Sequence, residues 1–145
     1  EGRTPLVLGG DHSVSIGSLR GTSRDARVGV VWLDAHGDFN TPRTTPSGNV
    51  HGMALAAALG REAFAGHEWA HADLRAANVA WVGLRDLDAG EREAIGGSAA
   101  TAFTMSDIDR EGIHAVVERA LDVDGDGTDG VHVSLDLDFL DPTEA

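Results

Sequence analysis

Residues 28–38 read VGVVWLDAHGD and residues 130–138 read GVHVSLDLD. Each stretch opens with a short, mainly apolar run that is typical of a buried strand, and each continues with polar residues at alternate positions. Those alternate residues are Asp34, His36, Asp38, Asp136 and Asp138. Because successive side chains of an extended chain point to opposite faces, the members of each set are predicted to project to one side. Two strands therefore direct acids and a histidine toward a common place.

Strands and helices are predicted to alternate along the sequence. The predicted strands, each short, apolar and buried on both faces, are residues 4–8, 26–33, 78–84, 101–105 and 129–135. The predicted helices are residues 13–24, 51–59, 88–95 and 106–121. This alternation predicts an α/β fold with a doubly wound, mainly parallel sheet and helices on both faces. Ligands bind at the carboxyl ends of strands in such folds, so GGDHS at 9–13 is expected beside the two acidic motifs.

The composition limits the partners and the organisation. The 145 residues fit a single domain, 1–145, and carry a net charge of −13. Such a charge repels phosphate backbones and anionic lipid surfaces, so neither nucleic acid nor a membrane is expected as a partner. The chain has no Cys, which excludes disulfides and thiolate metal sites. No apolar run approaches the ~20 residues of a membrane span. We expect a cytoplasmic protein and, since the sequence begins with Glu1, a fragment of a longer chain.

The acids predict a cation site. Four carboxylates at one sheet edge would repel one another by roughly several kcal/mol at an effective dielectric of ~20, so they are either partly protonated or neutralised by cations. The candidate ligands are His12, Asp34, His36, Asp38, Asp136 and Asp138. Two divalent ions would balance the four charges, and oxygen with imidazole nitrogen suits Mn²⁺ first, with Fe, Co, Ni or Zn as alternatives. Asp11 is expected to accept a hydrogen bond from the second nitrogen of His12. The alternative is that these acids are helix caps and solvated loop residues.

Two shorter motifs suggest other chemistry. HEWAH at 67–71 matches the H-E-x-x-H pattern of zinc peptidases, which requires a continuous helix, but Gly66 precedes it and its flanks lack an amphipathic stripe. DVDGDGTDG at 122–130 begins like a calcium loop, yet Val133 stands where a bidentate Glu is needed. We therefore expect a solvated loop at 122–130 and treat the peptidase as a minor alternative.

Four motifs together resemble the ureohydrolase family, and within it the arginases. They are GGDHS at 9–13, DAHGDFNTPRTTPSGNVHGM at 34–53, VGLRDLDAGE at 82–91 and SLDLDFLDP at 134–142. The resemblance implies a three-layer α/β fold of the arginase/deacetylase type. It also implies that residues 1–145 form one ureohydrolase domain that is truncated at both ends.

The resemblance implies a centre with two Mn²⁺ ions. One ion would be held by His12, Asp34, Asp38 and Asp136, and the other by Asp34, His36, Asp136 and Asp138. A hydroxide between the ions would attack the guanidinium carbon of L-arginine, giving L-ornithine and urea. Asp38 would orient this hydroxide, and His51 would exchange protons with the departing amine.

The resemblance also implies where the substrate binds. The α-carboxylate would be bound by Asn40, Thr45, Ser47 and Asn49, and the α-amino group by Asp88 and Glu91. The glutamate that holds the guanidinium is expected beyond residue 145, so the isolated chain is expected to be weakly active or inactive. The full-length protein is expected to be a homo-oligomer, a trimer or hexamer. The alternatives are an agmatinase or another guanidino-acid hydrolase with the same metal site, and a metal-binding pseudoenzyme.

Overall fold

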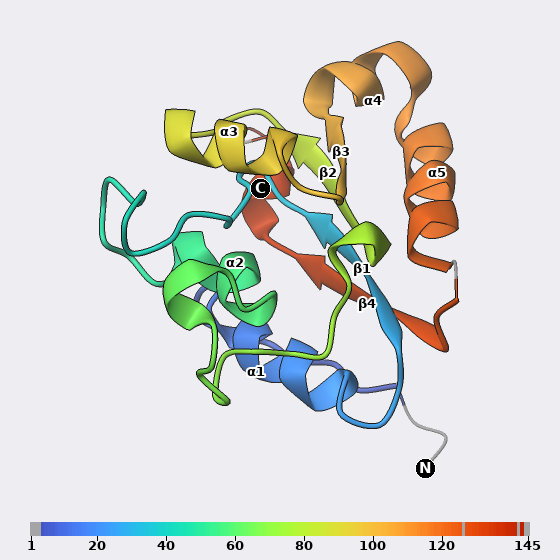
Figure 1. Cartoon of the computed structure of the whole chain (residues 1–145). Helices are drawn as coiled ribbons and strands as arrows, with labels where there is room; N and C mark the ends of the chain where they lie inside the picture. Colours follow the sequence, from blue (N-terminus) through green and yellow to red (C-terminus); the bar gives the residue numbers. More distant parts are fainter. Residues whose placement is uncertain (1–3, 126, 142, 144–145) are drawn as a thin grey trace.

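A parallel sheet of four strands forms the centre of the chain. The structure, a computed structural model, describes residues 4–125, 127–141 and 143. The strands are β1 (Val28–Leu33), β2 (Val79–Leu84), β3 (Thr101–Thr104) and β4 (Gly130–Leu135). They lie in the order β3-β2-β1-β4, and every neighbouring pair is parallel (Figure 1). The predicted α/β class with a mainly parallel sheet is thus confirmed.

Helices cover both faces of this sheet. The α-helices are α1 (Val14–Thr22), α2 (Ala54–Ala58), α3 (Ala89–Gly96), α4 (Met105–Glu111) and α5 (Ile113–Gly125). Short 3₁₀ turns lie at η1 (His51–Met53), η2 (Glu62–Phe64), η3 (Ala76–Asn78) and η4 (Leu137–Phe139). Helices α1 and α2 pack together on one side of the sheet, and α5 lies against β1 and β2 on the other (Figure 1). None of the helices in the described part of the chain has both the length and the apolar character of a membrane span.

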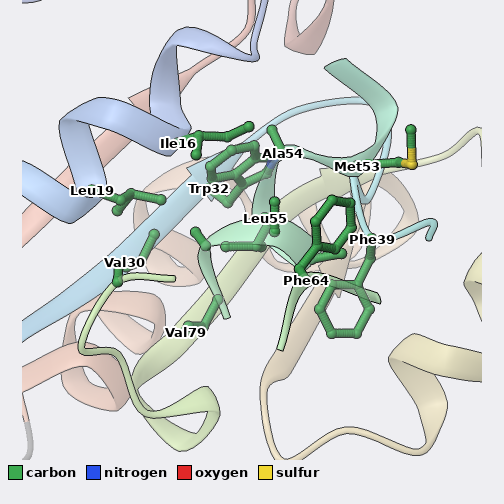
Figure 2. Close-up of a cluster of buried hydrophobic side chains, with 14 of the residues drawn as sticks. Ile16, Leu19, Val30, Trp32, Phe39, Met53, Ala54, Leu55, Phe64 and Val79 are labelled. Carbon is green, nitrogen blue, oxygen red and sulfur yellow. The ribbon is translucent and has the colours of Figure 1, made fainter. Parts of the chain in front are cut away.

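The two faces of β1 enter two separate hydrophobic clusters. Val30 and Trp32 face α1 and α2, where they meet Leu19 and Leu55 (Figure 2). Val31, between them, faces the cluster that α5 covers. Full burial of one such aliphatic side chain contributes roughly 1.5–3 kcal/mol, so the two central strands form a firm base for the loops at their ends.

The sheet is less enclosed at the β4 edge than the sequence suggests. Residues 4–8 form no strand, and Leu6 and Leu8 are 85% and 86% exposed, so the prediction of a first buried strand is wrong. Strand β4 exists, but Val133 is 61% exposed, so burial on both faces is also wrong for this strand. The reason is positional: Val133 is the sheet partner of Val31 and faces the side that α5 covers, but α5 lies mainly against β1 and β2 and leaves the edge strand partly uncovered.

The predicted helix at 106–121 is two helices. Gly112 separates α4 from α5 with a φ of +85°, a left-handed conformation that stops a helix and that glycine adopts without strain. The first helix begins earlier than predicted because Thr104 caps it: Asp107 N–H donates to Thr104 Oγ1 at 3.3 Å, and Thr104 N–H donates to Asp107 Oδ2 at 2.8 Å. Helix α5 continues to Gly125, so the predicted loop at 122–130 begins as helix, and Asp126 lies outside the described residues.

Candidate metal centre

Two parallel strands carry the acidic motifs to the same edge of the sheet. Strand β1 ends at Leu33 and β4 ends at Leu135, and these two residues are partners in the sheet register. Asp34 and Asp136 follow them directly, with Asp136 N–H donating to Leu33 O at 2.9 Å. Because parallel strands end side by side, the two carboxylates are neighbours although 102 positions separate them in the sequence.

A buried group of ligands forms around His12. Its Nδ1 lies 2.8 Å from Asp34 Oδ2, 3.1 Å from Asp38 Oδ2 and 3.4 Å from Asp136 Oδ2. His12, Asp34 and Asp38 are buried, and Asp136 is partly exposed. His12 Nδ1 thus lies close to oxygens of three different carboxylates.

A second, more exposed group forms around His36. Its Nδ1 lies 3.4 Å from Asp34 Oδ1 and 3.1 Å from Asp138 Oδ2. Asp34 therefore directs one oxygen to each histidine, which is the arrangement that a carboxylate bridging two ions requires. In each of the sets His12/Asp34/Asp136 and Asp34/His36/Asp138, the ligand atoms lie within 4.8 Å of one another.

The charges in this cluster perturb one another strongly. Burial disfavours a charged imidazole, but hydrogen bonds to Asp34 and Asp38 outweigh it and raise the pKa of His12 to about 9. A hydrogen bond to Asp34, partly offset by burial, also raises the pKa of His36 to about 9. Burial raises the pKa of Asp38 to about 6. Burial acts against the charge of Asp34 too, yet hydrogen bonds from both histidines hold its pKa well below its usual range.

This donor set fits divalent cations. In the metal-free chain, protons on His12 and His36 balance part of the negative charge, and they sit on nitrogens that face carboxylate oxygens. Cations at these two points would replace those protons and would meet oxygen and nitrogen ligands, the combination that Mn²⁺ and its neighbours accept. The structure therefore brings together all six residues that the sequence nominated as ligands.

The surroundings of His12 include two residues that the sequence did not nominate. His12 Nε2 lies 2.8 Å from Ser134 Oγ, and the imidazole stacks on Trp32 with ring centroids 4.0 Å apart. Trp32 Nε1 in turn donates to Asp34 Oδ2 at 3.2 Å. Both residues lie two positions before an acid, Asp34 or Asp136, and so on the same strand face, which is the signal that could have identified them.

The predicted role of Asp11 is wrong. Its Oδ1 accepts from Ser13 N–H at 2.9 Å and from Ser13 Oγ, which closes a local turn before α1. The second nitrogen of His12 binds Ser134 instead, because the long-range packing of α1 against β4 brings that hydroxyl closer than the neighbouring carboxylate.

A cavity of about 350 Å³ opens over the cluster. Besides the ligands, the predicted functional residues that line it are Asn40, Thr45, Ser47, His51, Asp88 and Glu91. Asn40 donates from Nδ2 to Asp88 Oδ2 at 3.0 Å, which joins the 40–49 loop to the residue that caps α3. Burial raises the pKa of Glu91 to about 7, although Phe39 N–H donates to its carboxylate at 2.8 Å.

Asn49 is the one predicted substrate residue that does not line this cavity. It is exposed, and its backbone N–H donates to Ser47 Oγ at 3.2 Å. The 40–50 loop has no regular period, so sequence spacing does not fix which of its polar side chains turn inward.

A second cavity lies at the opposite end of the sheet. It measures about 410 Å³ and is lined by Arg75, Ala77, Asn78, Thr101, Asp122 and Val123, near the amino ends of β2 and β3. Its lining holds one acid and no histidine, so the larger hollow lacks the convergent ligands of the smaller one.

The comparisons with known proteins agree with this geometry. A model of the Arginase family matches residues 1–145. The chain belongs to the arginase family. The arginase of Bacillus subtilis (strain 168) is 49% identical over an alignment of 148 positions, which covers 100% of this chain and 50% of that protein. The resemblance to ureohydrolases, and to arginases among them, is therefore confirmed.

Solved arginases have the same fold. The crystal structure of arginase from Bacillus cereus has a TM-score of 0.91 and 48% identity, over 99% of this chain and 50% of that one. An Entamoeba histolytica arginase, crystallised with L-ornithine, has a TM-score of 0.82 and 39% identity, over 93% of this chain and 47% of that one. The chain thus spans about half the length of the arginases that it matches.

The HEWAH motif of this arginase-family chain does not form the helix that a zinc peptidase needs. Residues 67–71 form turns, and among the described residues neither His67 nor His71 belongs to a group that could hold a metal ion. His71 instead packs beside Gly60, and Trp69 contacts Phe64.

Proposed function

We propose that the full-length protein is an arginase-type amidinohydrolase that converts L-arginine to L-ornithine and urea with two Mn²⁺ ions. The observation that carries this proposal is the buried carboxylate of Asp34, which directs one oxygen to each of two ligand groups. The relatives named arginase, one of them crystallised with L-ornithine, support the substrate class.

The metal ligands are proposed in two overlapping sets. His12, Asp34, Asp38 and Asp136 would hold one ion, and Asp34, His36, Asp136 and Asp138 the other. When bound, the ions would supply Lewis acidity, which lowers the pKa of a water so that hydroxide is available near neutral pH. Each histidine would release one proton when its ion binds.

Two side chains would manage the proton and the nucleophile. Asp38 lies within the cluster, and its carboxylate would accept a hydrogen bond from the attacking oxygen and fix its direction. His51 lines the same cavity from η1, and its imidazole can donate a proton to the departing amine and be reprotonated from solvent.

Cavity residues other than the metal ligands would bind the α-amino and α-carboxylate groups of the substrate. Asp88 and Glu91, at the start of α3, carry carboxylates that would receive the α-ammonium group. Asn40, Thr45 and Ser47 would donate to the α-carboxylate from the facing loop. Asn49 belongs to the same loop but is exposed, so it would join this group through a turn of its side chain toward the cavity. Agmatine has no carboxylate, so this loop would favour L-arginine.

The test uses the full-length protein loaded with Mn²⁺. We expect urea release from L-arginine and far less from agmatine, with two ions bound per chain. Two bound ions without urea from either substrate would contradict the proposal and indicate a pseudoenzyme, whereas faster turnover of agmatine would indicate an agmatinase. His51→Asn should keep both ions and lose most of the urea release.

Three further expectations complete the proposal. The 145 residues on their own would bind metal but release little urea, because the guanidinium-binding glutamate of the family lies outside them. The full-length protein would be a cytoplasmic homo-oligomer, a trimer or hexamer. Urea assays of the 145-residue chain and of the full-length protein test the first expectation. Light scattering of the full-length protein tests its oligomeric state.

A further inference from the structure

Asp38 has a positive backbone φ, which is uncommon outside glycine. Its φ is +49°, in the left-handed region that residues other than glycine seldom adopt. Such a conformation persists only where the surroundings hold it, and it tends to occur where a side chain must point in one direction. Here that direction carries the Asp38 carboxylate to 3.1 Å from His12 Nδ1.

The chain on either side of Asp38 is fixed from several directions. Asp38 O accepts from Leu55 N–H at 3.0 Å and from Ala56 N–H at 3.2 Å, at the beginning of α2. Trp81 Nε1 donates to Gly37 O at 2.8 Å. These contacts hold the backbone at Gly37 and the carbonyl of Asp38. The backbone on the C-terminal side of Asp38 is held through contacts of Phe39.

Arg61 contacts both the carbonyl and the ring of Phe39. Arg61 donates from Nη1 to Phe39 O at 2.7 Å, and its guanidinium carbon lies 4.1 Å from the centre of the Phe39 ring. The opposite edge of that buried ring meets Trp81 with centroids 5.0 Å apart. A charged donor makes a stronger hydrogen bond than a neutral one, and stacking over the ring fixes the plane of the guanidinium.

Arg61 stands outside the site that it supports. It is half-buried and is absent from the lining of the cavity, whereas Glu91, which binds Phe39 N–H from the other side, belongs to that lining. The Arg61 side chain therefore reaches the site through Phe39, while its backbone N–H donates to Ala56 O at 3.0 Å, in the turn that binds Asp38 O.

We propose that Arg61 is a positioning residue: by clamping the carbonyl and the ring of Phe39, it keeps Asp38 in its left-handed conformation and its carboxylate among the metal ligands. The inference rests on the proposed function only in taking Asp38 as a ligand. Nothing in the sequence motifs points to Arg61, which lies 23 positions after Asp38 in LGRE.

The experiment compares three variants of the full-length protein. Arg61→Met keeps an apolar stem against the ring and removes the donor, and Arg61→Lys keeps a charged donor without the planar stack. The matched control is Arg20→Met, because Arg20 is exposed and donates to a backbone carbonyl, His71 O, at 3.4 Å, away from the cavity. Mn²⁺ affinity is measured by calorimetry, and the melting temperature of each metal-free protein is recorded.

We expect Arg61→Met to weaken one of the two Mn²⁺ sites about tenfold, as loss of groups that orient a ligand usually does. Its kcat should fall more than its KM rises, Arg61→Lys should recover part of the affinity, and Arg20→Met should match the wild type. A lower melting temperature with both Mn²⁺ affinities unchanged would show that Arg61 is merely structural and would overturn the inference.

Two further results keep the test decisive. If Arg61→Met does not fold, Arg61→Lys decides: a measurable loss of affinity at one site supports the inference, and wild-type affinity at both overturns it. If the wild type binds two ions and releases no urea, the proposed function fails, whereas the comparison of Mn²⁺ affinities remains valid.

Discussion

The two halves of the candidate metal centre differ in how the fold holds them. Around His12, that residue and Asp38 are only 6% and 5% exposed, and Trp32 and Ser134 contact the imidazole. Around His36, the imidazole and the Asp138 carboxylate are each 45% exposed. A ligand that is packed on all sides loses little freedom when an ion arrives, whereas an exposed one must be ordered by the ion itself.

This difference predicts an order of binding. The ion bound by the His12 group should bind first and more tightly. The ion bound by the His36 group should bind second and dissociate first. The acids follow a similar contrast: Asp34, directly after the central strand β1, is buried, whereas Asp136 and Asp138, after the edge strand β4, are partly exposed.

The largest loss of Mn²⁺ affinity is expected from substitution of Asp34, which both ligand groups share. Asp34→Asn removes the charge that serves both ligand groups, so neither half should retain tight binding, and urea release should be abolished. Asp129→Asn is the matched control, since Asp129 is an exposed acid paired with Arg27. Calorimetric titration with Mn²⁺ measures both variants, and one intact tight site in Asp34→Asn would contradict a shared carboxylate.

Single losses of the histidines should separate the halves. We expect His12→Ala to remove the tighter site and to lower the affinity at the other, while His36→Ala leaves the tighter site near its wild-type affinity. The reason is that His12 completes the buried group, whereas His36 serves the exposed one. Stepwise Mn²⁺ titration with magnetic-resonance detection of free ion distinguishes them, and the reverse order would refute the contrast.

The pH dependence should reverse when metal is added. The pKa of His12 and of His36 is about 9 in the metal-free fold, against about 6.5 for an unfolded histidine. Their stabilising contribution is therefore complete below pH ~6.5 and is lost as the pH rises through 9, so the metal-free protein should melt at lower temperature at pH 9 than at pH 6.5.

Mn²⁺ displaces the same protons, so its affinity should increase over that interval. Melting curves under nitrogen at several pH values, with and without Mn²⁺, measure both trends. A metal-free protein that becomes more stable between pH 6.5 and 9 would show that the two histidines do not carry these protons.

The smallest effect is expected from the hydroxyl behind the buried half. Ser134→Ala removes the partner of His12 Nε2 and should weaken the tighter site by about tenfold, without loss of stoichiometry. Ser98→Ala is the control, because it loses only local bonds after α3, one to Ile95 O and one from Ala100 N–H. Equal affinities in Ser134→Ala and the wild type would mean that stacking on Trp32 alone orients the imidazole.

The sequence predicted which ligands meet, but not the backbone that brings them together. The alternation assumed an extended chain, whereas β1 ends at Leu33, Asp38 has a φ of +49° and Asp138 lies in the 3₁₀ turn η4. The two sets are neighbours because parallel strands end together at one edge of the sheet. The position of Asn49 was not predictable in this way, because its loop has no period.

Contacts between distant segments were missed for another reason. Ser134 meets His12 across 122 positions, and Arg61 meets Phe39 across 22, so only the assembled topology brings them together. The apolar residues 4–8 have the composition of a strand, but a strand forms only beside a partner, and composition does not reveal whether one is present.

The outer side of β4 has a practical consequence for handling these 145 residues alone. Val131, Val133 and Leu135 are exposed along that strand, and in the described part of the sheet its outer backbone groups face no other strand. Such an edge is a template onto which a second polypeptide can add. Preparations of this piece should therefore self-associate as concentration increases, with a rising sedimentation coefficient, and charged replacements such as Val133→Lys should keep it monodisperse.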